Sequence, residues 1–245
     1  MRIGLLYPTR DCGEDDFAAL CRRLDPAPEL DFAYVEWDPG AAGQIAAVRA
    51  LGSPGRLVAA ADRLGTTPDV VSWACSSCSF THGLDGARDQ ARALSDHLGV
   101  PASSTSLAYL AALDRLDVER VALASVYHPD LTALFAAFLA EAGVTTVHAV
   151  SADAGSDRAL AAWDAQRITE LAVAADHQDA AAVLVPETAL HTTPLLAELE
   201  ERLEKPVLTA TAVTVWDALG GKVQSGLGTL FRAGPGRRPP SSSAS

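Results

Sequence analysis

The sequence is poor in positive charge. Only 19 of its 245 residues are Lys or Arg, against 31 that are Asp or Glu, and the formal net charge is -12 at pH 7. A surface of this sign repels nucleic-acid phosphates and anionic membranes. We therefore expect no nucleic-acid partner and no membrane partner. An anionic substrate would have to be held locally by amide N–H groups, hydroxyls or a well-placed cation.

A secretory leader and long apolar runs are also missing. The first apolar stretch ends at Pro8, which makes it too short for a signal peptide, and no later run reaches membrane-spanning length. These features predict a cytoplasmic protein, in which the four cysteines are reduced and no disulfide framework is expected. The single C-x-x-C motif has no second paired motif, so no metal site is predicted.

Apolar runs of strand length alternate with helical patterns along the chain. Strands are predicted at 3–7, 30–37, 70–73, 120–125, 144–150, 181–185 and 206–209, and Val100-Pro101 leads into a short extended piece before the helix at 106. Helices are predicted at 14–24, 40–64 with a break at 53–55, 85–98, 106–113, 129–142, 159–175, 193–203 and 211–219. Such alternation is typical of an α/β protein with doubly wound parallel sheets.

Three segments recur in the same order. Residues 2–7 and 120–125 each place a basic residue before an apolar strand, 70–75 and 182–187 each end a strand in a polar loop, and 100–106 matches 205–211. The repeat predicts two similar halves related by a pseudo-two-fold axis. We place them at 1–115 and 116–219, followed by a largely disordered tail at 220–245, and the C-terminal helix could pack back on the first half.

The segment 69–80 is the most informative part of the chain. Its apolar strand stops abruptly at Cys75-Ser76-Ser77-Cys78, and open α/β sheets carry their chemistry at the carboxyl ends of strands. The N–H and O–H donors around Cys75 would favour a thiolate nucleophile. Two other interpretations stay open: Cys75 is a small buried core residue, or the C-x-x-C is a redox pair. The predicted helix begins only near residue 85, which disfavours the redox pair.

Glu187 stands out in the second half because it follows a core strand directly. Burial there would raise the pKa of its carboxyl and suit it to proton transfer, although it could instead stabilise a helix N-terminus. Tyr127 ends another strand and could donate its hydroxyl to a substrate or simply cap the core. Arg10 and His191 are the basic side chains on the predicted rim, where surface placement is the default.

These features resemble the Asp/Glu racemase superfamily, and within it the branch of maleate cis-trans isomerase and arylmalonate decarboxylase. The resemblance runs from Ile3 to about Leu219. Its motifs are GLLYP at 4–8, ACSSCSF at 74–80, RVALASVY at 120–127 and KPVLT at 205–209, before Trp216.

The resemblance implies a reaction without a cofactor. In this family two cysteines, one from each half, act on opposite faces of a carbon next to a carboxylate. Cys75 falls on the first position, which the isomerase keeps as Cys and the decarboxylase has as Gly. Glu187 falls on the second position, so an acid would have to handle the proton on that face. Ser76, Ser77 and Tyr127 fall on positions that bind the substrate carboxylate.

The remaining expected contacts come from the loops beside these residues. The family's first-loop Asn falls on Asp11, next to Arg10, which suggests a changed substrate contact. The full set of expected substrate-binding residues is Pro8, Thr9, Arg10, Asp11, Ser76, Ser77, Tyr127, Thr188 and His191. The expected partner is a small carboxylate, and a homodimer is left open.

The leading hypothesis is a cofactor-independent isomerase or racemase of a small carboxylate, with maleate to fumarate as the named case. The Cys75 thiolate would add to the alkene, and Glu187 would manage the proton on the opposite face. One alternative is decarboxylation of a disubstituted malonate, with Cys75 protonating an enediolate. The other is a non-catalytic carboxylate-binding protein, because the second family cysteine is missing.

Overall fold

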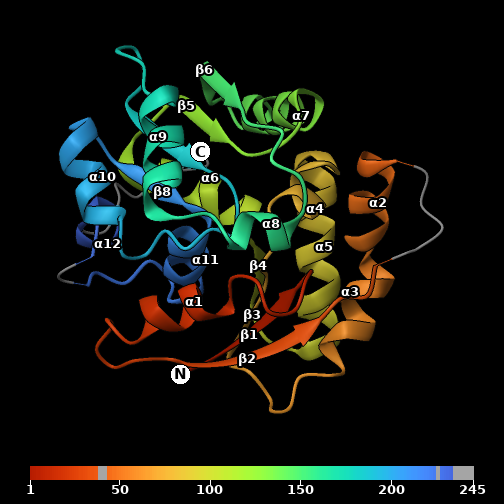
Figure 1. Cartoon of the computed structure of the whole chain (residues 1–245). Helices are drawn as coiled ribbons and strands as arrows, with labels where there is room; N and C mark the ends of the chain where they lie inside the picture. Colours follow the sequence, from red (N-terminus) through yellow and green to blue (C-terminus); the bar gives the residue numbers. More distant parts are fainter. Residues whose placement is uncertain (38–42, 225–226, 234–245) are drawn as a thin grey trace, which may run out of the picture.

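The computed structural model describes residues 1–37, 43–224 and 227–233. Within these ranges the chain forms two four-stranded parallel sheets, with strand orders β2-β1-β3-β4 and β6-β5-β7-β8. Figure 1 shows one sheet above the other, with helices between and around them. This is the α/β class that the sequence predicts, and the two sheets share one strand order.

The first sheet and its helices come from the amino-terminal part of the chain. Its elements are β1 (Arg2–Tyr7), α1 (Glu14–Cys21), β2 (Glu29–Tyr34), α2 (Gln44–Leu51), α3 (Pro54–Ala61), β3 (Val70–Trp73), α4 (Ser77–Phe80), α5 (Gly83–Leu98), β4 (Ala102–Ser104) and α6 (Thr105–Leu116).

The second sheet follows the same plan. Its elements are β5 (Arg120–Ser125), α7 (Pro129–Glu141), β6 (Thr145–Ser151), α8 (Asp157–Ala161), α9 (Ala165–Ala175), β7 (Ala182–Val185), α10 (Leu196–Leu203), β8 (Val207–Thr209), α11 (Ala210–Ala218) and α12 (Thr229–Arg232).

The strands that lead to the central loops are buried along their whole length. Every residue of β3 (VVSW) and β7 (AVLV) is buried, as expected for strands of a parallel sheet covered by helices on both faces. Both strands pair in parallel with the first strand of their own sheet. Their carboxyl ends therefore lie beside those of β1 and β5, and the loops that follow gather at one edge of each sheet.

Helices α6 and α11 hold the two sheets together. They pack against each other, and the hydroxyls of Thr105 and Thr214 are hydrogen bonded at 2.8 Å. Helix α11 also contacts α1, β3 and β4 of the first sheet. Tyr109 of α6 donates its hydroxyl to the Val185 carbonyl at the end of β7, at 2.7 Å. These buried contacts join the halves into one packed unit.

An aromatic cluster crosses the same boundary. Phe80 of α4 lies 5.7 Å from Tyr127 and 4.9 Å from Phe135 between ring centroids, and Tyr109 lies 5.6 Å from Phe135. All four rings are buried. Pairs at these spacings add attraction beyond the burial of apolar area, so the cluster fixes α4 and its preceding loop against the second half.

Several predicted boundaries differ from the structure. The predicted strand 30–37 ends at Tyr34. The predicted helix 159–175 is two helices, because the Asp164 side chain accepts a hydrogen bond from the Arg167 N–H at 2.8 Å and starts α9 anew. The C-x-x-C segment does open a short helix, α4 from Ser77, so the expectation that no helix starts before residue 85 is wrong.

The tail expected at 220–245 is ordered in part. Leu230 and Phe231 of α12 are buried, and the Thr229 N–H and hydroxyl donate to the Glu200 carboxylate at 2.7 to 2.9 Å. Leu230, Phe231 and the hydrogen bonds to Glu200 thus hold α12 in place. The helix is too short for its periodicity to be recognised in the sequence. Residues 234–245 lie outside the described residues. No helix in the described ranges is long and apolar enough to cross a bilayer.

Candidate active site

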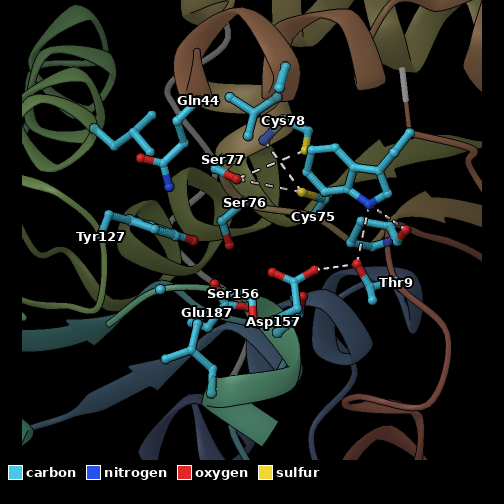
Figure 2. Close-up of a pocket in the computed structure, with 18 of the residues that line it drawn as sticks. Thr9, Gln44, Cys75, Ser76, Ser77, Cys78, Tyr127, Ser156, Asp157 and Glu187 are labelled. Carbon is cyan, nitrogen blue, oxygen red and sulfur yellow. Dashed lines mark hydrogen bonds between the residues drawn. The ribbon is translucent and has the colours of Figure 1, made fainter. Parts of the chain in front are cut away.

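A cavity of about 300 Å³ lies between the two halves. The first half lines it with the loops after β1, β2 and β3 and with α2, and the second half with the loops after β5, β6 and β7. Figure 2 shows side chains from both halves pointing into it. The carboxyl ends of the strands therefore converge on one site, as the repeat predicts.

Cys75 enters this cavity from the end of β3 and is 5% exposed. The backbone N–H of Cys78 donates to its sulfur at 3.4 Å, and the Ser77 hydroxyl lies 3.8 Å from the same atom. The loop is held from behind, because the Ser106 hydroxyl donates to the Ser76 carbonyl at 2.9 Å. A thiol with N–H and O–H donors around its sulfur is suited to hold negative charge there.

Glu187 enters from the end of β7, on the side opposite Cys75 (Figure 2). Its carboxyl is 7% exposed and accepts a hydrogen bond from the Ala189 N–H at 2.8 Å. Burial, together with the nearby Asp157 carboxylate, raises the pKa of Glu187 to about 8, against the opposing effect of its hydrogen bonds. Glu187 is therefore mainly a protonated acid at neutral pH.

Tyr127 and Ser76 present hydroxyls to the cavity beside Cys75 (Figure 2). Burial raises the pKa of Tyr127 well above its usual value, so its phenol stays a donor, and it donates to the Pro186 carbonyl. The Ser76 hydroxyl is buried and has no hydrogen-bond partner in the described part of the chain. Such an unpaired buried donor is costly unless a ligand accepts from it.

The loops at positions 8–9 and 188 complete the site. Pro8, Thr9 and Thr188 line the cavity, and the Thr188 hydroxyl donates across the halves to the Ala74 carbonyl at 3.4 Å. The two loops touch closely at Gly13, where a Cβ would lie 2.0 Å from the Thr188 carbonyl oxygen. A side chain at Gly13 would push the halves apart.

Three of the predicted contacts, Arg10, Asp11 and His191, do not line this cavity. The Arg10 guanidinium stacks on the Tyr34 ring at 3.9 Å, and His191 pairs with Asp15 at 2.6 Å. Asp11 has a left-handed backbone, with φ 60, and its N–H donates to Glu14. The chain turns back onto α1 at this point, so residues beyond Thr9 leave the cavity.

The chain is similar in sequence and in fold to proteins of one known family. Residues 54–231 match the family described as Arylmalonate decarboxylase (Amdase). Arylmalonate decarboxylase of Bordetella bronchiseptica is 32% identical over 169 residues, which cover 66% of this chain and 70% of that protein. The chain belongs to the arylmalonate decarboxylase family.

Solved structures agree with this assignment. A glycine-to-cysteine mutant of arylmalonate decarboxylase in its sulfate-associated form superposes with a TM-score of 0.78 at 29% identity, covering 94% of this chain and 99% of the other. A mutant maleate isomerase from Pseudomonas putida S16 with maleate gives 0.82 at 18% identity, covering 96% and 98%. The second likeness shows the shared fold alone. The predicted branch of the Asp/Glu racemase superfamily is confirmed.

Several residues that line the cavity were not predicted from the sequence, namely Trp37, Gln44, Ser156, Asp157 and Arg158. They follow β2 and β6, the one strand pair that the repeat was not used to match. Extending the repeat to residues 29–34 and 145–151 would have pointed to both loops. The precise turn that brings Asp157 inward is set by the Ser156 side chain, which caps α8.

The cavity of this arylmalonate decarboxylase family member offers no clustered metal ligands. Among the described residues, no group of three or more His, Cys, Asp or Glu side chains could hold a metal ion. All four cysteines, which lie in described segments, are free and buried. The groups that line this cavity and could take part in chemistry include hydroxyls, the thiols of Cys75 and Cys78, the carboxyls of Asp157 and Glu187, and the Arg158 guanidinium.

Proposed function

We propose that this protein is a cofactor-independent decarboxylase of disubstituted malonates, in which Cys75 protonates the product carbon. One observation carries the proposal: Cys75 and buried hydroxyl donors face the same closed cavity in a chain of the arylmalonate decarboxylase family. From the sequence alone, isomerisation was the leading hypothesis and decarboxylation an alternative. The family match and the 32% identity favour the decarboxylase alternative instead.

The hydroxyls hold one carboxylate of the malonate. Ser76 and Ser77 would donate to it, and Tyr127 would join them by turning its hydroxyl away from the Pro186 carbonyl. The Ser76 hydroxyl, which has no acceptor in the described part of the chain, gains most from such a ligand. The C–C bond to the other carboxylate breaks, carbon dioxide leaves, and the electron pair passes into an enediolate. The same donors stabilise the enediolate because its charge develops on the oxygens that they already contact.

The apolar part of the cavity takes the second carboxylate and the substituents. Val48, Leu131 and Leu160 line it, and a carboxylate that is poorly solvated there gains by losing its charge as carbon dioxide. The Cys75 S–H then gives its proton to the α carbon of the enediolate. The thiolate that remains recovers a proton from solvent, and the cycle closes.

A second candidate function is isomerisation or racemisation of a carboxylate, as the sequence analysis proposed. One specific observation favours it: Glu187 lies across the cavity from Cys75 and can hold a proton at neutral pH. A thiolate could then remove an α proton from one face while Glu187 delivers one to the other. The same pair would manage addition to, and rotation of, maleate.

The test is to supply an aryl(methyl)malonate and, separately, maleate, and to follow carbon dioxide release and loss of the alkene. We expect carbon dioxide from the malonate, a rate unchanged in Cys21→Ala, and a loss of roughly 10²-fold or more in Cys75→Ala. Cys21 is a matched control because it is a buried thiol of α1 that does not line the cavity.

Two results would overturn the proposal. If Cys75→Ala turns over the malonate as fast as the wild type, Cys75 is not the proton donor. If the protein consumes maleate and releases no carbon dioxide from malonates, the second candidate is favoured. Binding of both acids without turnover would support the non-catalytic alternative.

A further inference from the structure

A second carboxyl lies beside Glu187 in the cavity. Asp157 begins α8, is half-buried, and faces the cavity between Glu187 and the loop after β1 (Figure 2). The Thr9 hydroxyl donates to Asp157 Oδ2 at 2.5 Å. Thr9 belongs to the first half and Asp157 to the second, so this hydrogen bond joins the halves at the site.

Trp37 leaves the hydroxyl hydrogen of Thr9 free for that hydrogen bond. Its indole N–H donates to the Pro8 carbonyl at 3.1 Å and to Thr9 Oγ1 at 3.3 Å. An indole N–H is a donor only, so Thr9 Oγ1 is the acceptor from Trp37 and its own hydrogen is free for Asp157. Burial raises the pKa of the Asp157 carboxyl, and the hydrogen bond from Thr9 opposes that rise because it stabilises the charged form.

The other groups around Glu187 carry no charge to compete with Asp157. Tyr7 of β1, Tyr109 of α6 and Tyr127 after β5 all interact with Glu187, and burial raises the pKa of each phenol, so they stay neutral. Cys12, in the loop after β1, also has a raised pKa because of burial. Among the described residues that line the cavity, Arg158 is the one with a positively charged side chain, and it is exposed.

We propose that Asp157 is a positioning residue for Glu187: the two acids share one proton, and Thr9, by holding Asp157 as the carboxylate, keeps that proton on Glu187. Two carboxyls at one site do not both ionise readily, because like charges repel in a poorly solvated space. The inference rests on the second candidate function, which gives Glu187 the role of proton carrier on the face opposite Cys75.

The pairing can be measured without turnover. The infrared band of a protonated carboxyl is assigned to Glu187 by its loss in Glu187→Gln and is then followed as the pH is raised. We expect the wild-type band to disappear near pH 8. In Asp157→Asn it should disappear at a pH lower by about one unit or more, because the repelling charge is gone.

Thr9 gives an independent arm. Thr9→Val should divide the protonated band between Glu187 and Asp157, because Asp157 loses its donor, and Thr9→Ser should restore the wild-type band. Asp164→Asn is the matched control: it makes the same change in the same half, where Asn keeps the cap of α9, and should leave the titration unchanged.

The proposal is overturned if Asp157→Asn leaves the Glu187 band titrating as in the wild type, or if Thr9→Val leaves the band wholly on Glu187. If Asp157→Asn does not fold, the two Thr9 variants decide. The outcome is separate from that of the proposed function: a protein that shows the shared proton but releases no carbon dioxide refutes only the decarboxylase assignment.

Discussion

The two halves share a strand order but differ in what they place at the ends of their central strands. In the first half β3 leads to a thiol and hydroxyls at 75–77, whereas in the second β7 leads to the acid Glu187. The first half also contributes the Thr9 hydroxyl, after β1, and the second half contributes the Asp157 carboxyl, after β6. A symmetric scaffold thus presents opposite faces of one cavity with chemically different groups.

This difference explains how one site could treat the two faces of a carbon unequally. A thiol is a proton donor whose thiolate is also a strong nucleophile, whereas Glu187 is a buried carboxyl whose pKa is raised to about 8, so it can hold a proton at neutral pH. Two like groups would make the faces equivalent. With unlike groups, one face of the carbon meets the thiol that delivers a proton, and the other face meets the acid that holds one.

The largest expected effect breaks the comparison at Glu187. Glu187→Gln should slow racemisation of an α-aryl carboxylate by roughly 10²-fold, because moving a proton from one face of the carbon to the other needs a group on each face. It should leave malonate decarboxylation within about tenfold, since the proposed proton donor there is Cys75. Loss of optical rotation measures the first rate. Equal losses in both reactions would mean that the halves do not divide the work.

A stability change sharpens the comparison at the aromatic boundary. Phe80→Ala should lower the free energy of unfolding by about 3–5 kcal/mol, because it leaves a cavity between Tyr127 and Phe135. Phe32, a partly buried ring within the first half, is the control. Urea denaturation should show a smaller loss for Phe32→Ala. A larger loss at Phe32 would place the stabilising contacts within the half rather than between halves.

The raised pKa of Glu187 also predicts how stability changes with pH. From its usual value of 4.5 up to about 8, Glu187 holds a proton in the folded protein that the unfolded chain has lost, so the folded state becomes less stable as pH rises through this window. Glu187→Gln removes that dependence. We expect the variant to gain about 2 kcal/mol over the wild type at pH 8 and nearly nothing at pH 4.

Urea denaturation at both pH values measures this gain. Glu198→Gln, an acid of α10 outside the cavity, serves as the control and should show no such difference between the two pH values. If the difference in stability between Glu187→Gln and the wild type is the same at both pH values, the claim that burial raises the pKa of Glu187 is contradicted.

The smallest effects are expected where the structure corrects the sequence. Arg10→Ala and His191→Ala should leave decarboxylation within about twofold, because stacking on Tyr34 and pairing with Asp15 keep both side chains outside the cavity. Steady-state kinetics check this. A loss of tenfold or more in either variant would return that residue to the site.

These corrections show what sequence patterns can and cannot reach. Apolar runs such as 182–185 and the repeat predicted both sheets and the loops of Cys75 and Glu187, because buried parallel strands are nearly all apolar. The turn at Asp11 depends on its left-handed backbone conformation, and the position of Asp157 in the cavity depends on the Ser156 cap of α8. Hydrophobic periodicity predicts neither feature. Helix α12 depends on a buried carboxylate contributed by α10.

The most direct measurement is the configuration of the product from a prochiral aryl(methyl)malonate. We predict that the wild type and the double variant Cys75→Ala, Glu187→Cys give opposite enantiomers, because their thiols would reach the enediolate from opposite halves. The same enantiomer from both proteins would contradict the account, since it would mean that the two loops do not address opposite faces of one carbon.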